Sequence, residues 1–164
     1  MKNLGLENYP FQSVLVDDCD YDRVSRHKWY YNSTNNSINS ILYNDKWQAI
    51  GSISLSRFIL NISDSDILVD HRDRNIFNNT QENLRPCDRS QNGANRTKLS
   101  SNTSGYKGVY FNKIRQKWQA SIMINKKQIT LGRFNNKEMA AKVYDKAAKE
   151  LFGEFACLNF PEKE

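Results

Sequence analysis

The chain has 164 residues, of which 38% are hydrophobic and 26% charged, a composition that fits one or two small domains with modest cores. We expect no membrane span and no signal peptide, because no apolar run approaches roughly 20 residues and the first ten residues lack a basic start followed by an apolar stretch. The whole net charge of +6 lies in residues 104–164, since residues 1–103 contain twelve basic and twelve acidic residues, and such a region indicates phosphate contact rather than a merely solvated charged face.

The first sixty residues are expected to form a small β scaffold. In chain order the pattern predicts short strands at 14–17 and 28–31, an Asn/Ser-rich loop at 32–39, a hairpin with strands at 41–43 and 47–50, and a helix at 55–62. His27, one of only two histidines, is interpreted as structural. This scaffold is expected to bury one face of the segment that follows.

The segment from Val69 to Asn92 concentrates the residue types that carry metal and proton chemistry. Its expected elements are a strand at 67–70, a polar loop at 72–80, a second strand at 82–86, and a helix from Arg89 with Asp88 as N-cap. Oxygens of Asp and Asn can hold one hard metal ion, and a His beside them can take a proton from water. A strand–strand–helix fold of this order puts Asp70 at a strand end opposite Asn92.

A polar stretch at 97–104, interpreted as a flexible linker, leads into a more regular pattern. From Lys117 to Ile124 polar and apolar residues alternate strictly; a turn at 125–126 and a partner strand follow, and residues 108–111 supply a third strand. Asn136 is expected to cap a helix that ends at Gly153. The pattern predicts a three-stranded sheet with one helix on its apolar face and a polar, basic face opposite.

The motif D-H, N-L-R and a further Asn resembles the ββα-metal active site of HNH endonucleases, most closely the phage and intron-associated branch. The upstream run V-L-V-D-D-C-D-Y-D-R-V-S-R-H-K-W-Y resembles the N-terminal part of such phage proteins. The resemblance implies that His71 is the general base and that Asp70 and Asn92 hold one Mg²⁺ or Mn²⁺ ion. It also implies that Asn83 is a structural residue that ties the loop together and keeps His71 oriented.

Two positions depart from these relatives. Arg74 stands where many of them have Gly, in the turn after the Asp-His pair, and Ser56 begins S-R-F where related phage chains often read H-R-L. Both changes bear on loop shape and on activity, and neither touches the expected metal ligands.

The region from residue 104 to 161 resembles the AP2/ERF DNA-binding domain. The matching pieces are Y-K-G-V at 106–109, W-Q-A at 118–120, L-G-R-F at 131–134, A-A-K-V-Y-D-K-A-A from 140 and L-N-F-P at 158–161. The family lays its sheet in the DNA major groove, and the positions that this implies for DNA contact are Lys107, Tyr110, Asn112, Lys117, Ser121, Met123, Gln128 and Thr130. Alternation alone puts the last five on the polar face. Phosphate contacts are expected from Lys113, Arg115, Lys126 and Arg133.

Together these features predict an α+β protein with an HNH domain at 1–96, whose ββα-metal core spans about 66–96, a linker at 97–104 and an AP2-like domain at 105–161. The three scattered cysteines contain no C-x-x-C pair, which argues against a zinc knuckle and favours a reducing cytoplasm, of a bacterium or a phage-infected cell.

The expected function is metal-dependent hydrolysis of duplex DNA by a phage or mobile-element enzyme of the homing type, with no membrane or small-molecule cofactor. The resemblance to HNH endonucleases implies products with 5′-phosphate and 3′-hydroxyl ends. Two alternatives stay open. One is a non-catalytic, sequence-specific DNA-binding regulator. The other is an RNA-binding module, disfavoured because Trp118 is expected to face the core. The target sequence, nicking versus double-strand cleavage, homing versus restriction, and monomer versus homodimer also stay open.

Overall fold

The structure is a computed structural model that describes residues 1–161, and it divides the chain into a first unit, Met1–Cys87, and a second that begins at Asp88. Both units mix short helices with small antiparallel sheets, as expected for an α+β protein. Across the described part of the chain, no helix has the length and apolar character needed to cross a membrane.

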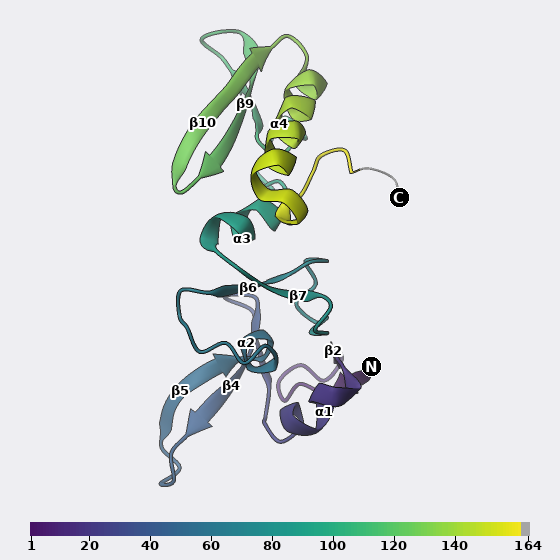
Figure 1. Ribbon diagram of the computed structural model, residues 1–164, viewed down its shortest axis with the longest axis vertical. Helices are drawn as coiled ribbons and strands as arrows, with labels where there is room; N and C mark the ends of the chain where they lie inside the picture. Colours follow the sequence, from purple (N-terminus) through teal and green to yellow (C-terminus); the bar gives the residue numbers. More distant parts are fainter. Residues whose placement is uncertain (162–164) are drawn as a thin grey trace. The chain divides into compact units, whose positions relative to one another are not determined.

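The first unit is built from short strands and two short helices (Figure 1). In chain order these are β1 (Lys2–Leu4), β2 (Val14–Val16), α1 (Asp18–Val24), β3 (Tyr30–Asn32), β4 (Ser37–Tyr43), β5 (Ala49–Ser54), α2 (Leu55–Ile59), β6 (Leu68–His71) and β7 (Leu84–Cys87). They form three antiparallel sheets, β1–β2, β3–β4–β5 and β6–β7.

Some local expectations for this unit were wrong. Strand β1 and helix α1 were not predicted, β4 takes up the end of the expected loop at 32–39, and α2 is shorter than the predicted helix. Helix α1 buries the carboxylate of Asp20, which accepts hydrogen bonds from Arg23 Nε at 2.9 Å and Gln81 Nε2 at 2.7 Å. The sequence did not reveal α1, because one of the two partners that make the burial of Asp20 favourable, Gln81, lies 61 residues away along the chain.

The core of the first unit lies directly beneath β6 and β7. Val14, Trp29 and Leu55 are buried there, and Leu84 of β7 belongs to the same cluster, against which Val69 of β6 packs. The two strands are therefore fixed from one side by apolar burial, which favours a single register.

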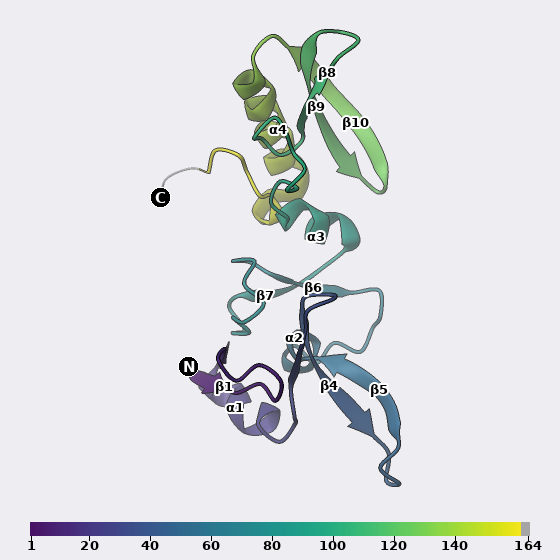
Figure 2. The same ribbon diagram turned by 180° about the vertical axis from the view of Figure 1, so that it is seen from behind.

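The second unit consists of α3 (Arg89–Asn95), β8 (Val109–Asn112), β9 (Lys117–Ile124), β10 (Lys127–Phe134), α4 (Lys137–Phe152) and the 3₁₀ turn η1 (Gly153–Phe155). The sheet is antiparallel with the order β10–β9–β8, and α4 lies along one of its faces (Figure 2). Asn136 caps α4 by accepting hydrogen bonds from the N–H groups of Glu138 and Met139, and Gly153 ends the helix, as predicted.

The apolar face of the sheet packs against α4 as the alternation of β9 predicts. Ala120 clusters with Ala140 and Ala141, while Ile122 clusters with Tyr144. Gly108 precedes β8 with φ +73°, and a Cβ there would lie 2.0 Å from Tyr144 Cδ2. Only glycine permits this approach of the chain to the ring.

Helix α3 belongs to the second unit by its contacts. Ser90 Oγ donates to Asn125 Oδ1 at 3.1 Å, and the carbonyl of Ala94 accepts from the N–H of Cys157 at 3.0 Å and from Lys107 Nζ. The stretch at 97–104 is also hydrogen-bonded within this unit: Ser104 is buried, and its hydroxyl donates to the carbonyl of Tyr106 at 3.0 Å.

Candidate active site and DNA-facing surface

Asp70 and His71 end strand β6, and the antiparallel register sets Asp70 opposite Arg85 and His71 opposite Leu84. Because successive side chains of a strand point to opposite faces, the two neighbours meet different surroundings. The carboxylate of Asp70 is buried in an ion pair with Arg85, whereas His71 is half-buried beside the loop that connects β6 to β7.

Asn83 closes that loop through both ends of its side-chain amide. Its Oδ1 accepts from the N–H of Asp73 at 3.0 Å, while its Nδ2 donates to Asp73 Oδ1 at 2.9 Å and to the carbonyl of Asn78 at 2.7 Å. Its own carbonyl accepts from the N–H of Arg72 at 2.9 Å. The buried Asn83 thereby fixes the loop directly after the Asp-His pair, at Arg72, Asp73 and Asn78.

Strand β2 and the residue that follows it support the same loop. The N–H of Leu15 donates to the carbonyl of Phe77 at 2.7 Å, and the carbonyl of Leu15 accepts from the N–H of Asn79 at 2.8 Å. Asp17 Oδ2 also accepts from the N–H of Gln81 at 2.7 Å. The position of His71 thus depends on residues at the start of the chain.

The imidazole of His71 is oriented by Asn79, a residue that the sequence did not single out. Asn79 Nδ2 donates to the carbonyl of Ile76 at 2.7 Å, so its Oδ1 is the acceptor that meets His71 Nε2 at 3.2 Å. This favours the tautomer with the proton on Nε2 and makes Nδ1 the basic atom. Nothing in the sequence distinguished Asn79 from the other asparagines of this loop.

Burial lowers the pKa of His71 below the ordinary value of 6.5, and this effect outweighs the hydrogen bond to Asn79 and the charges of Asp73 and Asp70, which act in the opposite direction. The imidazole is therefore neutral at pH 7, the form that accepts a proton. Burial raises the pKa of Asp73, but hydrogen bonds from Asn75, Asn78 and Asn83 together have a larger, opposite effect. The pKa of Asp73 is therefore below its ordinary value, and its carboxylate is ionised at pH 7.

Arg74 adopts the left-handed conformation, with φ +64°, in the turn directly after His71. Its N–H donates to the carbonyl of His71 at 2.9 Å, which closes the turn. This conformation costs an L-residue free energy that glycine avoids. The structure thus gives a physical reason for the glycine that the resemblance leads one to expect at this position.

The two expected metal ligands lie on different elements. Asp70 is on β6 in the first unit, and Asn92 is half-buried on α3 in the second. No group of three or more His, Cys, Asp or Glu side chains within residues 1–161 is arranged to hold a metal ion. The side chains of Asp and Asn supply hard oxygens of the kind that Mg²⁺ and Mn²⁺ accept, so the chemistry of the two residues fits the expected ion.

The polar face of the second unit's sheet is organised around Gln119, which is buried beneath its neighbours. Its Oε1 accepts from Asn112 Nδ2 at 3.2 Å and from Arg133 Nε at 3.1 Å, and its Nε2 donates to Thr130 Oγ1 at 3.0 Å. These contacts hold three of the expected DNA-facing residues in fixed directions. Gln119 itself was not predicted to have a role.

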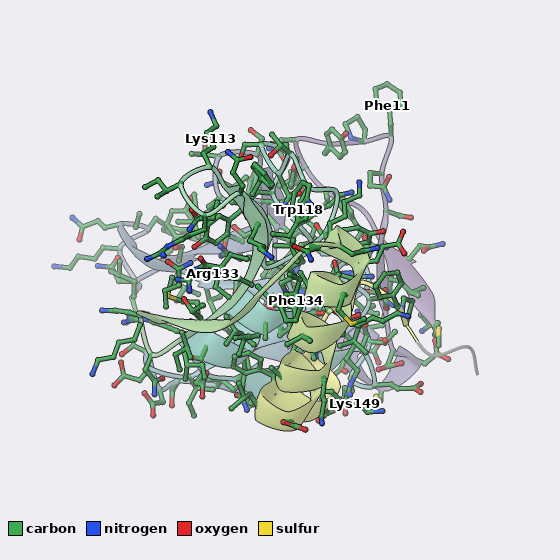
Figure 3. The ribbon with its side chains drawn as sticks, turned by 90° about the horizontal axis from the view of Figure 1, so that it is seen from above. Phe11, Lys113, Trp118, Arg133, Phe134 and Lys149 are labelled. Atoms are coloured by element: carbon green, nitrogen blue, oxygen red, sulfur yellow. The ribbon has the colours of Figure 1, made fainter. Side chains whose placement is uncertain are left out.

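Arg133 reaches this face because of an irregularity in β10. The register between β9 and β10 shifts between Thr130 and Gly132, which sets Arg133 opposite Gln119. Figure 3 shows Trp118 and Phe134 toward α4, where both pack on the core, and Arg133 away from it. Simple alternation would have placed Arg133 on the side of Ile129.

The remaining expected DNA-facing residues differ in exposure. Those exposed to solvent are Tyr110, Lys113, Arg115, Met123, Lys126 and Gln128. Lys117 is half-buried and donates to Asn135 Oδ1. Ser121 is buried, with its hydroxyl accepting from Gln128 Nε2 at 2.8 Å. Lys107, Ser121, Met123 and Gln128 line a cavity of about 430 Å³ together with residues of the 96–102 stretch.

Comparisons with known proteins agree with both halves of this description. Residues 104–154 match the AP2 domain family. The chain is 35% identical over 161 residues to an uncharacterised HNH endonuclease of Acanthamoeba polyphaga mimivirus, a match that covers 95% of this chain and 78% of the relative.

Two further relatives match one part each. Protein 3.8 of Escherichia phage T7 is 34% identical over 88 residues, which is 54% of this chain and 72% of that protein. An ethylene-responsive transcription factor-like protein of Arabidopsis thaliana is 52% identical over 42 residues, 26% of this chain and 18% of that protein. Since the mimivirus relative covers nearly the whole chain, the chain belongs to the HNH endonuclease family and carries a C-terminal AP2 domain.

Proposed function

We propose that this chain is a divalent-metal-dependent endonuclease that hydrolyses phosphodiester bonds of duplex DNA and leaves 5′-phosphate and 3′-hydroxyl ends. The observation that carries the proposal is the environment of His71: a neutral imidazole, held by Asn79 and lying next to Asp70, on a chain of the HNH endonuclease family. A phage or mobile element is the proposed source of the activity and a reducing cytoplasm its setting. This setting fits three cysteines that form no disulfide within residues 1–161.

In this mechanism His71 Nδ1 takes the proton of the attacking water. The water oxygen forms a bond to phosphorus as the bond from phosphorus to the 3′ oxygen breaks, and the leaving oxygen receives a proton from solvent. Asp70 and Asn92 would hold one Mg²⁺ or Mn²⁺ ion, which when bound supplies Lewis-acid chemistry at the scissile phosphate. Asn83 and Asn79 act by position, since they fix the loop and the ring.

Duplex DNA is the proposed partner of the polar sheet face. Gln128, Asn112, Lys107 or Lys117 would read bases, and Lys113, Arg115, Lys126 and Arg133 would contact phosphates. If about five phosphates are engaged, the affinity should fall with salt with a log–log slope of roughly −4 to −5. An affinity that is independent of salt would contradict this assignment.

The deciding experiment incubates the full chain with supercoiled plasmid and either Mg²⁺ or Mn²⁺. We expect metal-dependent nicking or linearisation that His71→Ala abolishes, while His27→Gln, a change at the other histidine, retains it. His27 suits this control because its ring packs against Trp29 and Phe58 within the scaffold. Binding of duplex DNA without cleavage, with either metal, would instead support a DNA-binding regulator, the second candidate, which the AP2 match favours.

A further inference from the structure

We propose that Arg85 is a positioning residue that sets the affinity of Asp70 for the divalent ion. Its guanidinium holds the carboxylate in place before the ion arrives, and its charge makes the ion bind more weakly than Asp70 alone would allow. The inference rests on the proposed function, because it concerns the metal ligand of that same site.

The contact that carries the inference is an ion pair across the β6–β7 ladder. Asp70 and Arg85 are paired in the antiparallel register, and Arg85 Nε and Nη2 donate to the same carboxylate oxygen, Asp70 Oδ2, at 2.9 and 2.8 Å. Both side chains are only 6% exposed. The pair is thus held by the strands themselves and shielded from water and salt.

This geometry restricts what Arg85 can do. A guanidinium that is 6% exposed and bonded to Asp70 is not presented to a phosphate arriving from solvent, so a direct clamp on DNA is disfavoured. An ionised carboxylate has about four acceptor directions, so Asp70 can keep both bonds from Arg85 and still act as a metal ligand. Arg85 therefore orients the ligand without replacing it.

Charge then determines the direction of the effect. A fixed positive charge beside the carboxylate repels a second cation, and in a buried site water screens this repulsion weakly. A neutral side chain of similar length at position 85 removes the positive charge that Arg85 places beside the Asp70 carboxylate. The metal ion becomes its counter-charge, so the neutral variant should bind metal more tightly while its metal-free form becomes less stable.

The test measures Mn²⁺ binding to the full chain by isothermal titration calorimetry, and thermal unfolding with and without Mn²⁺, for the parent and for Arg85→Met, Arg85→Gln and Arg85→Lys. We expect the dissociation constant to fall about tenfold or more in the two neutral variants and to stay within about twofold in Arg85→Lys. Arg57→Met is the matched control, because Arg57 donates to the carbonyls of Ile67 and Asp64 in the same unit.

The outcomes separate the inference from the function on which it rests. Equal or weaker Mn²⁺ binding in the neutral variants overturns the inference, since the replacement of a purely structural arginine would not tighten the binding of a cation. Neutral variants that fold only when Mn²⁺ is present support it, and variants that fold under neither condition overturn it, because the ion then cannot replace the guanidinium. Absence of Mn²⁺ binding to the parent chain contradicts the proposed function itself.

Discussion

Asn79→Asp offers a direct test of how the loop controls His71. The change places a negative charge where the amide oxygen now lies 3.2 Å from His71 Nε2 and keeps the size and the acceptor. At about 4 Å and an effective dielectric of about 20, such a charge stabilises the imidazolium by about 4 kcal/mol. Desolvation of the new carboxylate and repulsion from Asp70 and Asp73 reduce this, so we expect the acid limb of the pH–activity profile to move upward by about 1–3 pH units.

The sign of the effect follows from the protonation state of His71. In the parent chain its lowered pKa keeps the base neutral below pH 6.5, so activity should extend to more acidic pH than a solvent-exposed histidine allows. The same lowered pKa means that the unfolded state binds the proton more tightly, so this contribution to stability is present above about pH 6.5 and is lost as the pH falls. A carboxylate at position 79 reverses the first effect by favouring the charged ring.

Two readouts check the prediction. Proton–carbon NMR follows the imidazole signals with pH, and with two histidines in the chain His27→Gln assigns the spectrum. Plasmid nicking gives the pH–activity profile. Asn75→Asp is the matched control, because it adds the same charge to the same loop at an exposed position, where water screens it. It should change the titration of His71 and the pH–activity profile little. A His71 that titrates above 6.5 in the parent, or that ignores the new carboxylate, would refute the reasoning.

Three further changes probe the loop, the core and the DNA-facing surface. Gly108→Ala should destabilise the chain by about 2–5 kcal/mol in urea unfolding, because its Cβ would overlap the Tyr144 ring and φ is positive, whereas Gly51→Ala, with no atom within 4 Å, should change stability by less than about 0.5 kcal/mol. Arg74→Gly should leave nicking intact and raise stability by up to about 1 kcal/mol, since relief of the left-handed conformation exceeds the added chain entropy; a loss of stability would contradict this. Gln119→Leu should weaken duplex binding, measured by fluorescence anisotropy, by about 1–3 kcal/mol, or roughly 5- to 150-fold, because Asn112 and Arg133, the two longer of the three side chains that it holds, must then be ordered on binding. Unchanged affinity would contradict a role of Gln119 in DNA binding.

The parts of the fold that could be predicted from the sequence are those in which the local sequence pattern determines whether a side chain faces the core or the solvent. Strict alternation placed Trp118 and Ala120 of β9 on the apolar face, and the structure confirms it. The same rule fails at Arg133, because the register shift between Thr130 and Gly132 reverses the sides of the strand. Gly132 permits close packing there, since a Cβ would lie 2.7 Å from Phe134 Cζ, but a glycine in a strand does not by itself reveal a bulge.

The candidate site shows the same limit. The motif itself brought Asp70, His71 and Asn83 to attention, because their residue types and spacing are informative together. The sequence did not identify Asn79 and Arg85 as site residues, for two different reasons. Asn79 is one asparagine among several in a polar loop, and only the fold shows that it is 1% exposed and faces the imidazole. Arg85 is charged, and a charged residue is ordinarily expected at the surface, so its burial opposite Asp70 emerges only from the strand register.

Helix α3 shows most clearly why a local signal does not settle tertiary membership. Its start is predictable: the side chain of Asp88 accepts from the N–H of Gln91, and the side chain of Gln91 accepts from the N–H of Asp88, a complete capping box. Its partners are not, because the bonds from Ser90 to Asn125 and from Cys157 to Ala94 join residues far apart in the chain. The unit that carries the proposed DNA-binding sheet therefore begins well before the stretch that matches the AP2 domain family, and the expected ligand Asn92 is held by the same framework as that sheet.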